Sequence, residues 1–356
     1  MGNCIIGLGS GFGCLVSLVV VVGWLWFCLF SFLGFLLFVL WRFVVMVRLI
    51  YDGDPGIDDA LAILFAVKCG FLDLEAVTTV AGNVSLEKAT KNALRVLGLV
   101  GRLDVPVAAG MPYPLVRELV TAEHVHGEDG LGGTFLPLPP VQDKCMGAID
   151  LIVGKVLRRP GEITLVAGGP LTNLAEAYGR MPDLGERVGE VIVMGGAISV
   201  PGNVTPYAEF NVHTDPEAAK IIFESDLPLT LVPLDVTLKT LITGEDIEEI
   251  RGVGTPVTDF VYRVLRYSLN FPGHRRLGGC PIHDVLAVGV AVDRGFVRTK
   301  EFYVNVVTDN LVTLGKTVVS EKNVGEFEEC KSKINVCVDV NARKFIRFFI
   351  DTITSK

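Results

Sequence analysis

The chain has 356 residues, of which 50% are hydrophobic and 20% are charged, so it is more apolar than an ordinary soluble domain. Its formal net charge is −8 and it carries no basic stripe, which disfavours a nucleic acid or another polyanion as partner and favours a small-molecule substrate. None of its eight cysteines has a C-x-x-C or metal-like spacing, so we interpret them as free thiols.

The apolar excess is concentrated in an N-terminal leader, residues 1–45. Met1 to Trp41 contains no Asp, Glu, Lys, Arg or His, and residues 15–40 form an apolar run of the length that spans a bilayer. Arg42 and Arg48 follow the run, which is typical of a single anchor whose following domain stays on the cytoplasmic side. We therefore expect a possible transmembrane helix in residues 1–45, separate from a globular domain in residues 46–356.

After the leader, short apolar runs alternate with amphipathic stretches. Strands are expected at residues 44–51, 74–79, 105–108, 163–166, 191–194 and 229–232. Helices are expected from the acidic residues 52–59 to about residue 69 and at residues 85–100, 148–157, 215–224 and 257–269. This alternation predicts an α/β fold with a mostly parallel central sheet flanked by helices.

Two further regions complete the predicted domain. Residues 109–146 are rich in Gly and Pro with little periodicity, which indicates a long active-site loop. Residues 302–307, 312–319 and 334–340 are expected to be extra strands, followed by a helix at 341–354. We interpret these C-terminal elements as structural additions outside the site.

Four carboxylates, at Asp52, Asp54, Asp58 and Asp59, lie within eight residues at the first junction between a strand and a helix. The dipole of the helix would account for one of them, but not for all four. Like charges a few ångströms apart cannot all stay ionised without a neutralising partner, and a hard cation supplies one. Oxygen ligands favour Ca²⁺ or Mg²⁺ over zinc, and the spacing differs from an EF-hand loop.

Residues 52–59 resemble the Asp-x-Asp-Pro-Gly-x-Asp-Asp signature of the inosine-uridine-preferring nucleoside hydrolases. The similarity continues after about residue 46 in blocks that keep the order of that family, at residues 78–83, 124–127, 165–173, 194–196, 202–206, 208–211, 215–219 and 283–284. The resemblance implies a nucleoside hydrolase-like fold, Ca²⁺ as cofactor, a homo-oligomer, and hydrolysis of the N-glycosidic bond of ribonucleosides to free base and ribose.

The resemblance also implies a ligand set for the cation. Asp54, Asp59 and Asp284 match the calcium carboxylates, and the fourth ligand is the backbone carbonyl of Gly168. The family commonly has Thr at that last position. A carbonyl ligand does not need the side chain, so Gly168 keeps the site plausible but makes it less rigid.

Further residues are implied to contact the substrate. By similarity, the ribose hydroxyls are surrounded by Asp58, Asn83, Asn203, Glu209 and Asn211, with Met194 beneath the sugar. His126 lies in the long loop and is expected to contact the substrate, whereas His124, His213 and His274 are interpreted as solvated or packed. The leaving base is expected to meet Tyr267 and Phe271, under a mobile flap at residues 271–279.

In the implied mechanism, Asp54 is the base that takes a proton from the attacking water, and His283 is the acid that protonates the leaving base. Two other functions compete with this one. A haloacid-dehalogenase-type Mg²⁺ phosphatase also has an Asp-x-Asp pair after its first strand, but it needs Thr or Val where this chain has Gly56. A non-catalytic, membrane-tethered nucleoside-binding protein would need neither the metal nor the water that the acidic residues predict.

The similarity also bears on the leader. Residues 46–52 look like the natural beginning of a family member, so residues 1–45 are either an unusual extension or a mis-assigned translation start. The enzyme is expected to be membrane-anchored with a cytoplasmic domain in the first case, and cytoplasmic, starting at Met46, in the second.

Overall fold

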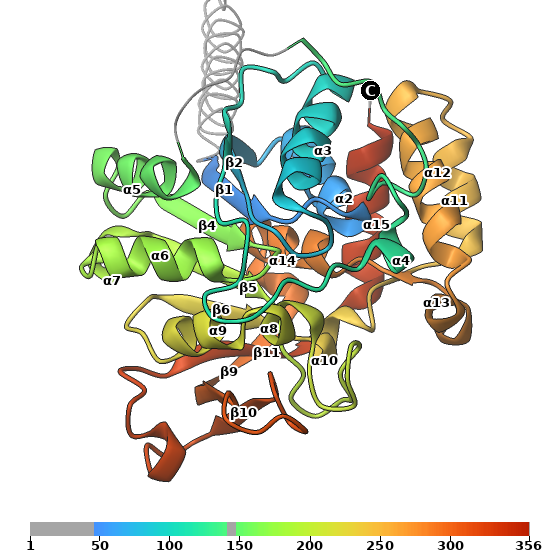
Figure 1. The fold of residues 1–356 in the computed structure, drawn as a ribbon. Helices are drawn as coiled ribbons and strands as arrows, with labels where there is room; N and C mark the ends of the chain where they lie inside the picture. The colour runs from blue at the N-terminus through green and yellow to red at the C-terminus, as the bar shows by residue number, and fades with distance from the viewer. Residues whose placement is uncertain (1–45, 141–146, 356) are drawn as a thin grey trace, which may run out of the picture. The chain divides into compact units, whose positions relative to one another are not determined.

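The computed structural model describes residues 46–140 and 147–355 (Figure 1). The leader at residues 1–45, with its expected membrane anchor, lies outside the described residues. Within the two described ranges, no helix has both the length and the apolar character that crossing a membrane requires. The role of the leader therefore stays a prediction.

Nine strands within the described ranges form one sheet, in the order β10-β9-β11-β6-β5-β4-β1-β2-β3. Their bounds are β1 (Val47–Gly53), β2 (Leu72–Thr79), β3 (Val107–Ala109), β4 (Ile163–Ala167), β5 (Glu190–Met194), β6 (Leu229–Val232), β9 (Val297–Val306), β10 (Thr317–Ser320) and β11 (Ile334–Val340). Neighbours from β3 to β11 are parallel, and only β9 pairs antiparallel, with β11 and β10. The predicted mostly parallel sheet is confirmed.

Helices cover both faces of this sheet (Figure 1). One face carries α2 (Ile57–Lys68), α3 (Leu86–Leu99), α11 (Gly244–Arg251), α12 (Pro256–Leu269), α14 (His283–Val292) and α15 (Ala342–Thr354). The other carries α5 (Ala148–Arg158), α6 (Thr172–Arg180), α7 (Leu184–Arg187) and α9 (Pro216–Phe223). Strand β1 serves both cores by its two-residue period, with Leu49 and Tyr51 on the first face and Ile50 on the second.

Smaller elements connect these layers. Four short helices are α4 (Glu123–His126), α8 (Phe210–Thr214), α10 (Leu234–Thr237) and α13 (Pro272–Leu277). Strands β7 (Leu241–Ile242) and β8 (Cys280–Pro281) form a separate two-stranded sheet, and single 3₁₀ turns occur at Arg294–Phe296 and Gly325–Phe327. Helix α9 begins as its sequence indicates, because the Asp215 side chain accepts the Ala218 N–H and Pro216 occupies the first turn.

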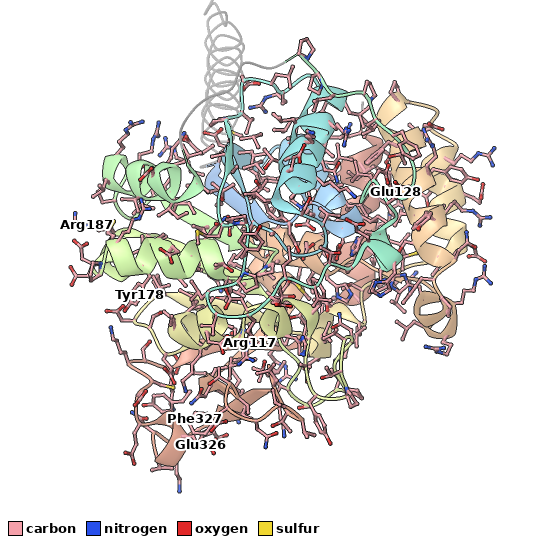
Figure 2. The ribbon with its side chains drawn as sticks, viewed as in Figure 1. Arg117, Glu128, Tyr178, Arg187, Glu326 and Phe327 are labelled. Atoms are coloured by element: carbon pink, nitrogen blue, oxygen red, sulfur yellow. The ribbon has the colours of Figure 1, made fainter. Side chains whose placement is uncertain are left out.

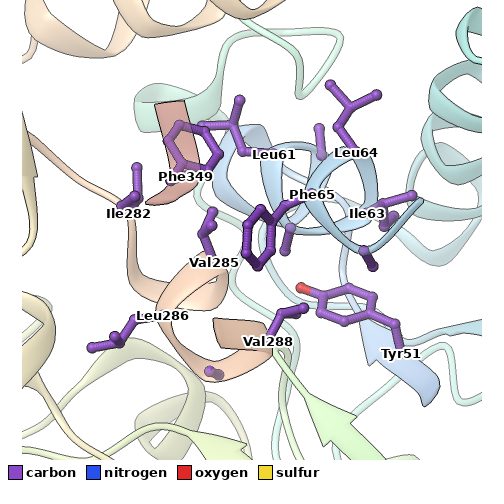
Figure 3. Close-up of a cluster of buried hydrophobic side chains, with 14 of the residues drawn as sticks. Tyr51, Leu61, Ile63, Leu64, Phe65, Ile282, Val285, Leu286, Val288 and Phe349 are labelled. Atoms are coloured by element: carbon purple, nitrogen blue, oxygen red, sulfur yellow. The ribbon is translucent and has the colours of Figure 1, made fainter. Parts of the chain in front are cut away.

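Apolar packing fixes the two helices that carry the acidic residues. Phe65 of α2 packs against Phe349 of α15 with ring centroids 5.9 Å apart, and Val285 and Val288 of α14 lie in the same cluster (Figure 3). Aromatic pairs at this separation add to the free energy of burial. The N-terminal ends of α2 and α14 are therefore held in place by the core behind them.

The C-terminal strands differ from their predicted bounds. β9 begins at Val297, earlier than expected, and β10 begins only at Thr317 because turns occupy the residues before it. Lys316 forms a bridge with Ala208, and the Thr317 side chain lies against Gly196. Lys316 and Thr317 thus support the loops that precede α8, whereas no residue of β9, β10 or β11 lines the cavity described below.

The long loop is tied down at its start. The guanidinium of Arg117 (labelled in Figure 2) donates to both carboxylate oxygens of Glu217, with the shortest distance 2.6 Å, and to the Thr308 carbonyl at 2.9 Å. Residues 141–146 of the predicted loop lie outside the described residues. The part that is described crosses the carboxyl edge of the sheet, where the loop was expected to help form a site.

Candidate active site

A cavity of about 560 Å³ lies at the carboxyl ends of the parallel strands. Asp54 follows β1, Asn83 follows β2, Gly168 follows β4 and Met194 ends β5. Because the carboxyl ends of parallel strands meet at one edge of a sheet, segments far apart in the sequence deliver their side chains to one place. The volume is within the range of small-molecule sites.

Three carboxylates gather at the floor of this cavity. Asp58, Asp59 and Asp284 each have an oxygen within 4.8 Å of the others'. The first two lie in the first turn of α2 and the third in the first turn of α14, where the helix dipole favours negative charge. The structure thus brings together two predicted metal ligands, Asp59 and Asp284. The third member of this group is Asp58, which was predicted to bind ribose, and not Asp54.

Asp59 is held by four donors. Its Oδ1 accepts the Tyr51 hydroxyl at 2.9 Å and the Asp54 backbone N–H at 3.1 Å. Its Oδ2 accepts the Gly56 N–H at 3.1 Å and the Asn83 side-chain amide at 3.2 Å. A carboxylate with this many donors has one orientation, so Asp59 is held in a fixed position between β1, the start of α2 and the loop after β2.

Asp54 is fully buried beside this group. Its Oδ2 accepts the N–H of Asn83, whereas its Oδ1 has no hydrogen-bond partner among the described residues. A buried carboxylate oxygen without a partner is costly, so Asp54 Oδ1 needs a cation, a water molecule or a substrate group.

Asp52 lies within β1, is fully buried, and has a different role. Its Oδ1 accepts the Thr78 hydroxyl at 2.5 Å and the Asn173 side-chain amide at 2.8 Å, and these bonds connect β1 with β2 and α6. Burial raises the pKa of Asp52 to about 6, against the opposing effect of these two hydrogen bonds. We assign Asp52 to the support of the strand edge.

The carboxylates of Asp54, Asp58, Asp59 and Asp284 lie close together, and both burial and mutual repulsion disfavour their charged forms. Burial raises the pKa of Asp58 and of Asp59 to about 6. Burial and the neighbouring carboxylates raise the pKa values of Asp54 and Asp284 further above the ordinary range. A bound cation reverses this effect because it favours the charged carboxylates. Crowded oxygen donors, raised pKa values and the unpaired Asp54 Oδ1 together fit a hard divalent cation.

The predicted ribose contacts line one wall of the cavity. Glu209 caps α8 by accepting the N–H groups of Asn211 and Val212 at 2.9 and 3.1 Å, and it also accepts the Gly196 N–H at 3.0 Å. The Asn211 amide donates to the Gly168 carbonyl at 2.7 Å. Asn203 accepts the Phe210 N–H at 2.9 Å. This network holds several polar side chains in fixed positions toward the cavity.

Two predicted histidines lie on the cavity wall. His126 accepts the Ile57 N–H through Nδ1 at 3.0 Å and lies against Gly56, at the start of α2. His283 is 2.7 Å from the Thr237 hydroxyl through its Nδ1. Burial lowers the pKa of His126 to about 4 and that of His283 to about 3, so both rings are neutral at pH 7.

The opposite wall is formed by α12 and α13. Leu265, Ser268 and Phe271 recur at intervals of three on the cavity side, and His274 follows from α13. Tyr267, predicted to contact the base, is absent from this wall and packs against Gly132 instead. The three-residue spacing places residues 265 and 268 inward, and Tyr267 therefore points elsewhere.

The predicted flap is a short helix in the structure, ending at Gly278 with a left-handed φ of 80°. His274 of α13 and His124 of the long loop were expected to be solvated or packed, but both line the cavity, together with Arg276 of the expected flap. The His274 ring lies 5.3 Å from the Phe271 ring, edge to face, and its Nδ1 is 2.9 Å from the Ser268 hydroxyl. Pro272 at the helix start and Gly278 at its end were the sequence signals for α13.

Cys280 also lines the cavity, beside Ser268. Burial raises the pKa of its thiol to about 11, which leaves it protonated and unreactive at neutral pH. The cysteines at 69, 280, 330 and 337 are buried and free, so the prediction of free thiols is confirmed for them. The remaining four lie outside the described residues.

Known proteins are similar to this chain in sequence and in fold. The family model described as "Inosine-uridine preferring nucleoside hydrolase" matches residues 49–347. The "Pyrimidine-specific ribonucleoside hydrolase RihA" of Citrobacter koseri is 38% identical over 299 residues, which cover 83% of this chain and 95% of the relative.

Solved structures agree in fold. A plant nucleoside hydrolase, PpNRh1, is 35% identical, with a TM-score of 0.83 over 87% of this chain and 99% of that one. A purine-preferring ribonucleoside hydrolase from Gardnerella vaginalis is 32% identical, with a TM-score of 0.81 over 86% of this chain and 98% of that one.

Proposed function

The chain belongs to the inosine-uridine preferring nucleoside hydrolase family and hydrolyses the N-glycosidic bond of ribonucleosides, and we propose that a divalent cation, Ca²⁺, bound at Asp59 and Asp284 serves this reaction. The observation that carries the proposal is the gathering of three carboxylates within 4.8 Å, beside an unpaired oxygen of Asp54. Family membership excludes the phosphatase, and the retained acidic residues argue against the non-catalytic binding protein.

Two residues complete the proposed ligand set. Asp54 offers its free Oδ1, and the Gly168 carbonyl has a lone pair left beside the hydrogen bond from Asn211. Asp58 competes for the third carboxylate position because it lies in the same group as Asp59 and Asp284. When bound, the cation supplies charge neutralisation, a contact for ribose hydroxyls and a lowered pKa of water.

The residues of the chain divide the chemistry among them. Asp54 Oδ1 is the acceptor for the proton of the attacking water, because Oδ2 is held by the Asn83 N–H. Glu209 and Asp58 place negative charge along the sugar, which stabilises a transition state with the character of an oxocarbenium ion.

The leaving base departs toward His283. Because burial holds this imidazole neutral at pH 7, His283 acts through a ring N–H while the Thr237 hydroxyl fixes its orientation. A neutral imidazole that lost its ring proton would become an imidazolate, so we propose that His283 donates a hydrogen bond to the leaving base and that the proton itself comes from solvent.

We propose that polar side chains held in fixed positions select ribose over deoxyribose. Asn83, Asn203, Glu209 and Asn211 are fixed by hydrogen bonds to backbone or side chains before any substrate binds. Asn83, Glu209 and Asn211 are buried, so a deoxyribose that leaves one of these groups without a partner costs more than the loss of one attractive contact. We expect strong discrimination against deoxynucleosides.

Base preference belongs to the wall formed by α12 and α13. The relatives differ in the base that their names give. The relative from Citrobacter koseri is named pyrimidine-specific, and the one from Gardnerella vaginalis is named purine-preferring. We propose that Phe271 supplies a stacking face and that Ser268, His274 and Arg276 meet the polar edge of the base.

Release of reducing sugar from inosine and uridine tests the proposed cation. Prolonged chelation should abolish ribose release, and Ca²⁺ added to the chelated protein should restore it. Elemental analysis of each preparation is the control. Full activity in a preparation shown to be free of metal contradicts the proposal.

The pH dependence of binding adds an independent measurement. The pKa values of Asp58 and Asp59 are about 6 without a cation, so protons compete with Ca²⁺ below that pH. Calorimetric affinity for Ca²⁺ should fall as the pH drops from 7.5 to 5, with protons released on binding. A pH-independent affinity would place the cation elsewhere.

A further inference from the structure

Tyr51 joins the apolar core to the proposed cation site. It lies in β1, is fully buried, and its ring packs within the cluster of α2 and α14 side chains (Figure 3). A buried tyrosine usually gives its hydroxyl a hydrogen-bond partner. Here the partner is Asp59 Oδ1, at 2.9 Å.

The same hydroxyl fills the space beside Gly168. A Cβ added at residue 168 would overlap the Tyr51 hydroxyl oxygen and lie 2.9 Å from Tyr51 Cζ and 3.2 Å from Asp284 Cγ. The backbone of Gly168 is not in the left-handed region, so space rather than conformation requires glycine here. Tyr51 and a side chain at residue 168 therefore exclude each other.

Gly53 shows that the fit extends around the ring. A Cβ at that position would lie 2.7 Å from Tyr51 Cε1 and would overlap Asp59 Oδ1. The phenol is thus enclosed between the backbone at the end of β1 and the backbone that follows β4. Among the described residues, the hydroxyl of Tyr51 has one charged hydrogen-bond partner, Asp59. Gly168 was expected to make the site less rigid. The Tyr51 hydroxyl instead fills the space that a side chain at residue 168 would occupy.

We propose that Tyr51 is a positioning residue of the cation site, whose hydroxyl orients Asp59 and takes the place of a side chain at residue 168. In this way the Asp59 carboxylate, the Asp284 carboxylate and the Gly168 carbonyl keep the arrangement that binds the cation. The inference rests on the cation site proposed above. Removal of a hydrogen bond that orients a metal ligand typically weakens metal affinity about 10- to 100-fold.

Tyr51→Phe in the full chain tests the hydroxyl. The ring stays in its apolar surroundings, and Asp59 Oδ1 keeps the Asp54 N–H, so the variant should fold. Competition with a fluorescent chelator should show Ca²⁺ affinity about 10-fold or more below wild type. The matched control is Tyr178→Phe, because Tyr178 (labelled in Figure 2) also donates to an aspartate at 2.9 Å, but outside the cavity.

Terbium luminescence supplies a spectroscopic readout. Tyr51 would lie next to a bound Tb³⁺, whereas the three tryptophans, at 24, 26 and 41, all belong to the leader. Tyrosine-sensitised emission that Ca²⁺ displaces should be present in wild type and in Tyr178→Phe and should largely disappear in Tyr51→Phe. Such a loss, compared at equal bound Tb³⁺, does not follow from a general decrease in stability.

Gly168→Ala provides a second variant that does not depend on Tyr51→Phe. The added methyl group collides with the Tyr51 hydroxyl, so Ca²⁺ affinity should fall in this variant as well. In the double variant the colliding oxygen is gone, so the two losses should combine to less than their product.

The outcomes separate the two proposals. If wild type itself binds neither Ca²⁺ nor Tb³⁺, the cation site is wrong and the role of Tyr51 with it. If wild type binds but Tyr51→Phe has the same affinity and the same sensitised emission, only the positioning role is overturned. Fully multiplicative losses in the double variant also contradict it, because they would show that residues 51 and 168 act independently.

Discussion

Asp54 is the proposed base, and its surroundings differ from those of the neighbouring Asp58. Asp54 is fully buried with one free oxygen, whereas Asp58 lines the open cavity. Asp54→Asn should lower kcat by about 10³-fold or more, because it removes the base and a proposed ligand together. Steady-state kinetics with inosine, alongside thermal unfolding, measures the effect. Turnover near that of wild type would refute the assignment.

Asp58→Asn is the matched comparison. If Asp58 mainly contacts ribose, KM should rise while Ca²⁺ affinity stays close to that of wild type. If it supplies the third carboxylate of the cation, as its place beside Asp59 and Asp284 allows, Ca²⁺ affinity should fall instead. The pair of variants therefore decides between the two candidate ligand sets.

His283 is tested through the leaving group. His283→Ala should slow hydrolysis of inosine more than that of p-nitrophenyl riboside, whose leaving group needs no proton. The ratio of the two kcat/KM losses isolates the contact between His283 and the leaving base from any effect on folding. Equal losses on both substrates would show that His283 only positions Asp284 or the sugar.

Single residues were predictable where a motif concentrates them. The motifs at residues 52–59 and 283–284 are specific enough to identify the acidic group from the sequence alone. The residues predicted to contact ribose were chosen by similarity to the family, and they line one wall of the cavity. The neutral state of His283 was not predictable, because it depends on burial by distant segments. The fit between Tyr51 and Gly168 also requires coordinates, since the two residues lie far apart in the sequence and their contact has no sequence spacing.

At the scale of elements, periodicity located the parallel strands β1 to β6 and six of the helices within a few residues, but it did not predict α6 or α11. It failed where several short signals compete: residues 312–315 were expected in a strand but form turns, and the segment expected to be a flap contains helix α13. Tyr267 was chosen by residue type, whereas the helical phase of α12 turns Leu265 and Ser268 toward the cavity. Phase within an amphipathic helix is the better guide to which side chains reach a site.

Helix α13 carries a prediction of its own. His274→Ala should change the ratio of kcat/KM for uridine to that for inosine by about 10-fold or more, because a polar group facing the base is lost. Ca²⁺ affinity should not change. Arg275→Ala is the control, since Arg275 is exposed and does not line the cavity. An unchanged ratio in His274→Ala would move base recognition away from this helix.

For the whole molecule, the alternation of strands and helices was sufficient for the fold class, and the acidic motif after the first strand was sufficient to place the site at the carboxyl edge. The order of strands was not predictable from the pattern, and neither was the support that Lys316 and Thr317 give to the loops that precede α8. Such long-range pairing depends on which surfaces fit after the chain has folded. We propose a homo-oligomer on the basis of the family alone, and sedimentation of the full-length protein tests it.

The leader is the remaining question at this scale, and we propose that residues 1–45 lie outside the catalytic domain. The first backbone hydrogen bond of β1 is donated by Val47 to Phe71, the family match begins at residue 49, and every proposed site residue follows. A shortened chain that begins at Met46 should therefore be soluble, folded and as active per molecule as the full chain. Far-UV circular dichroism and ribose release from inosine compare the two proteins, with the full chain kept in detergent. If the shortened chain is insoluble or inactive while the full chain in detergent works, the apolar leader is part of the functional domain and the boundary at Met46 is wrong.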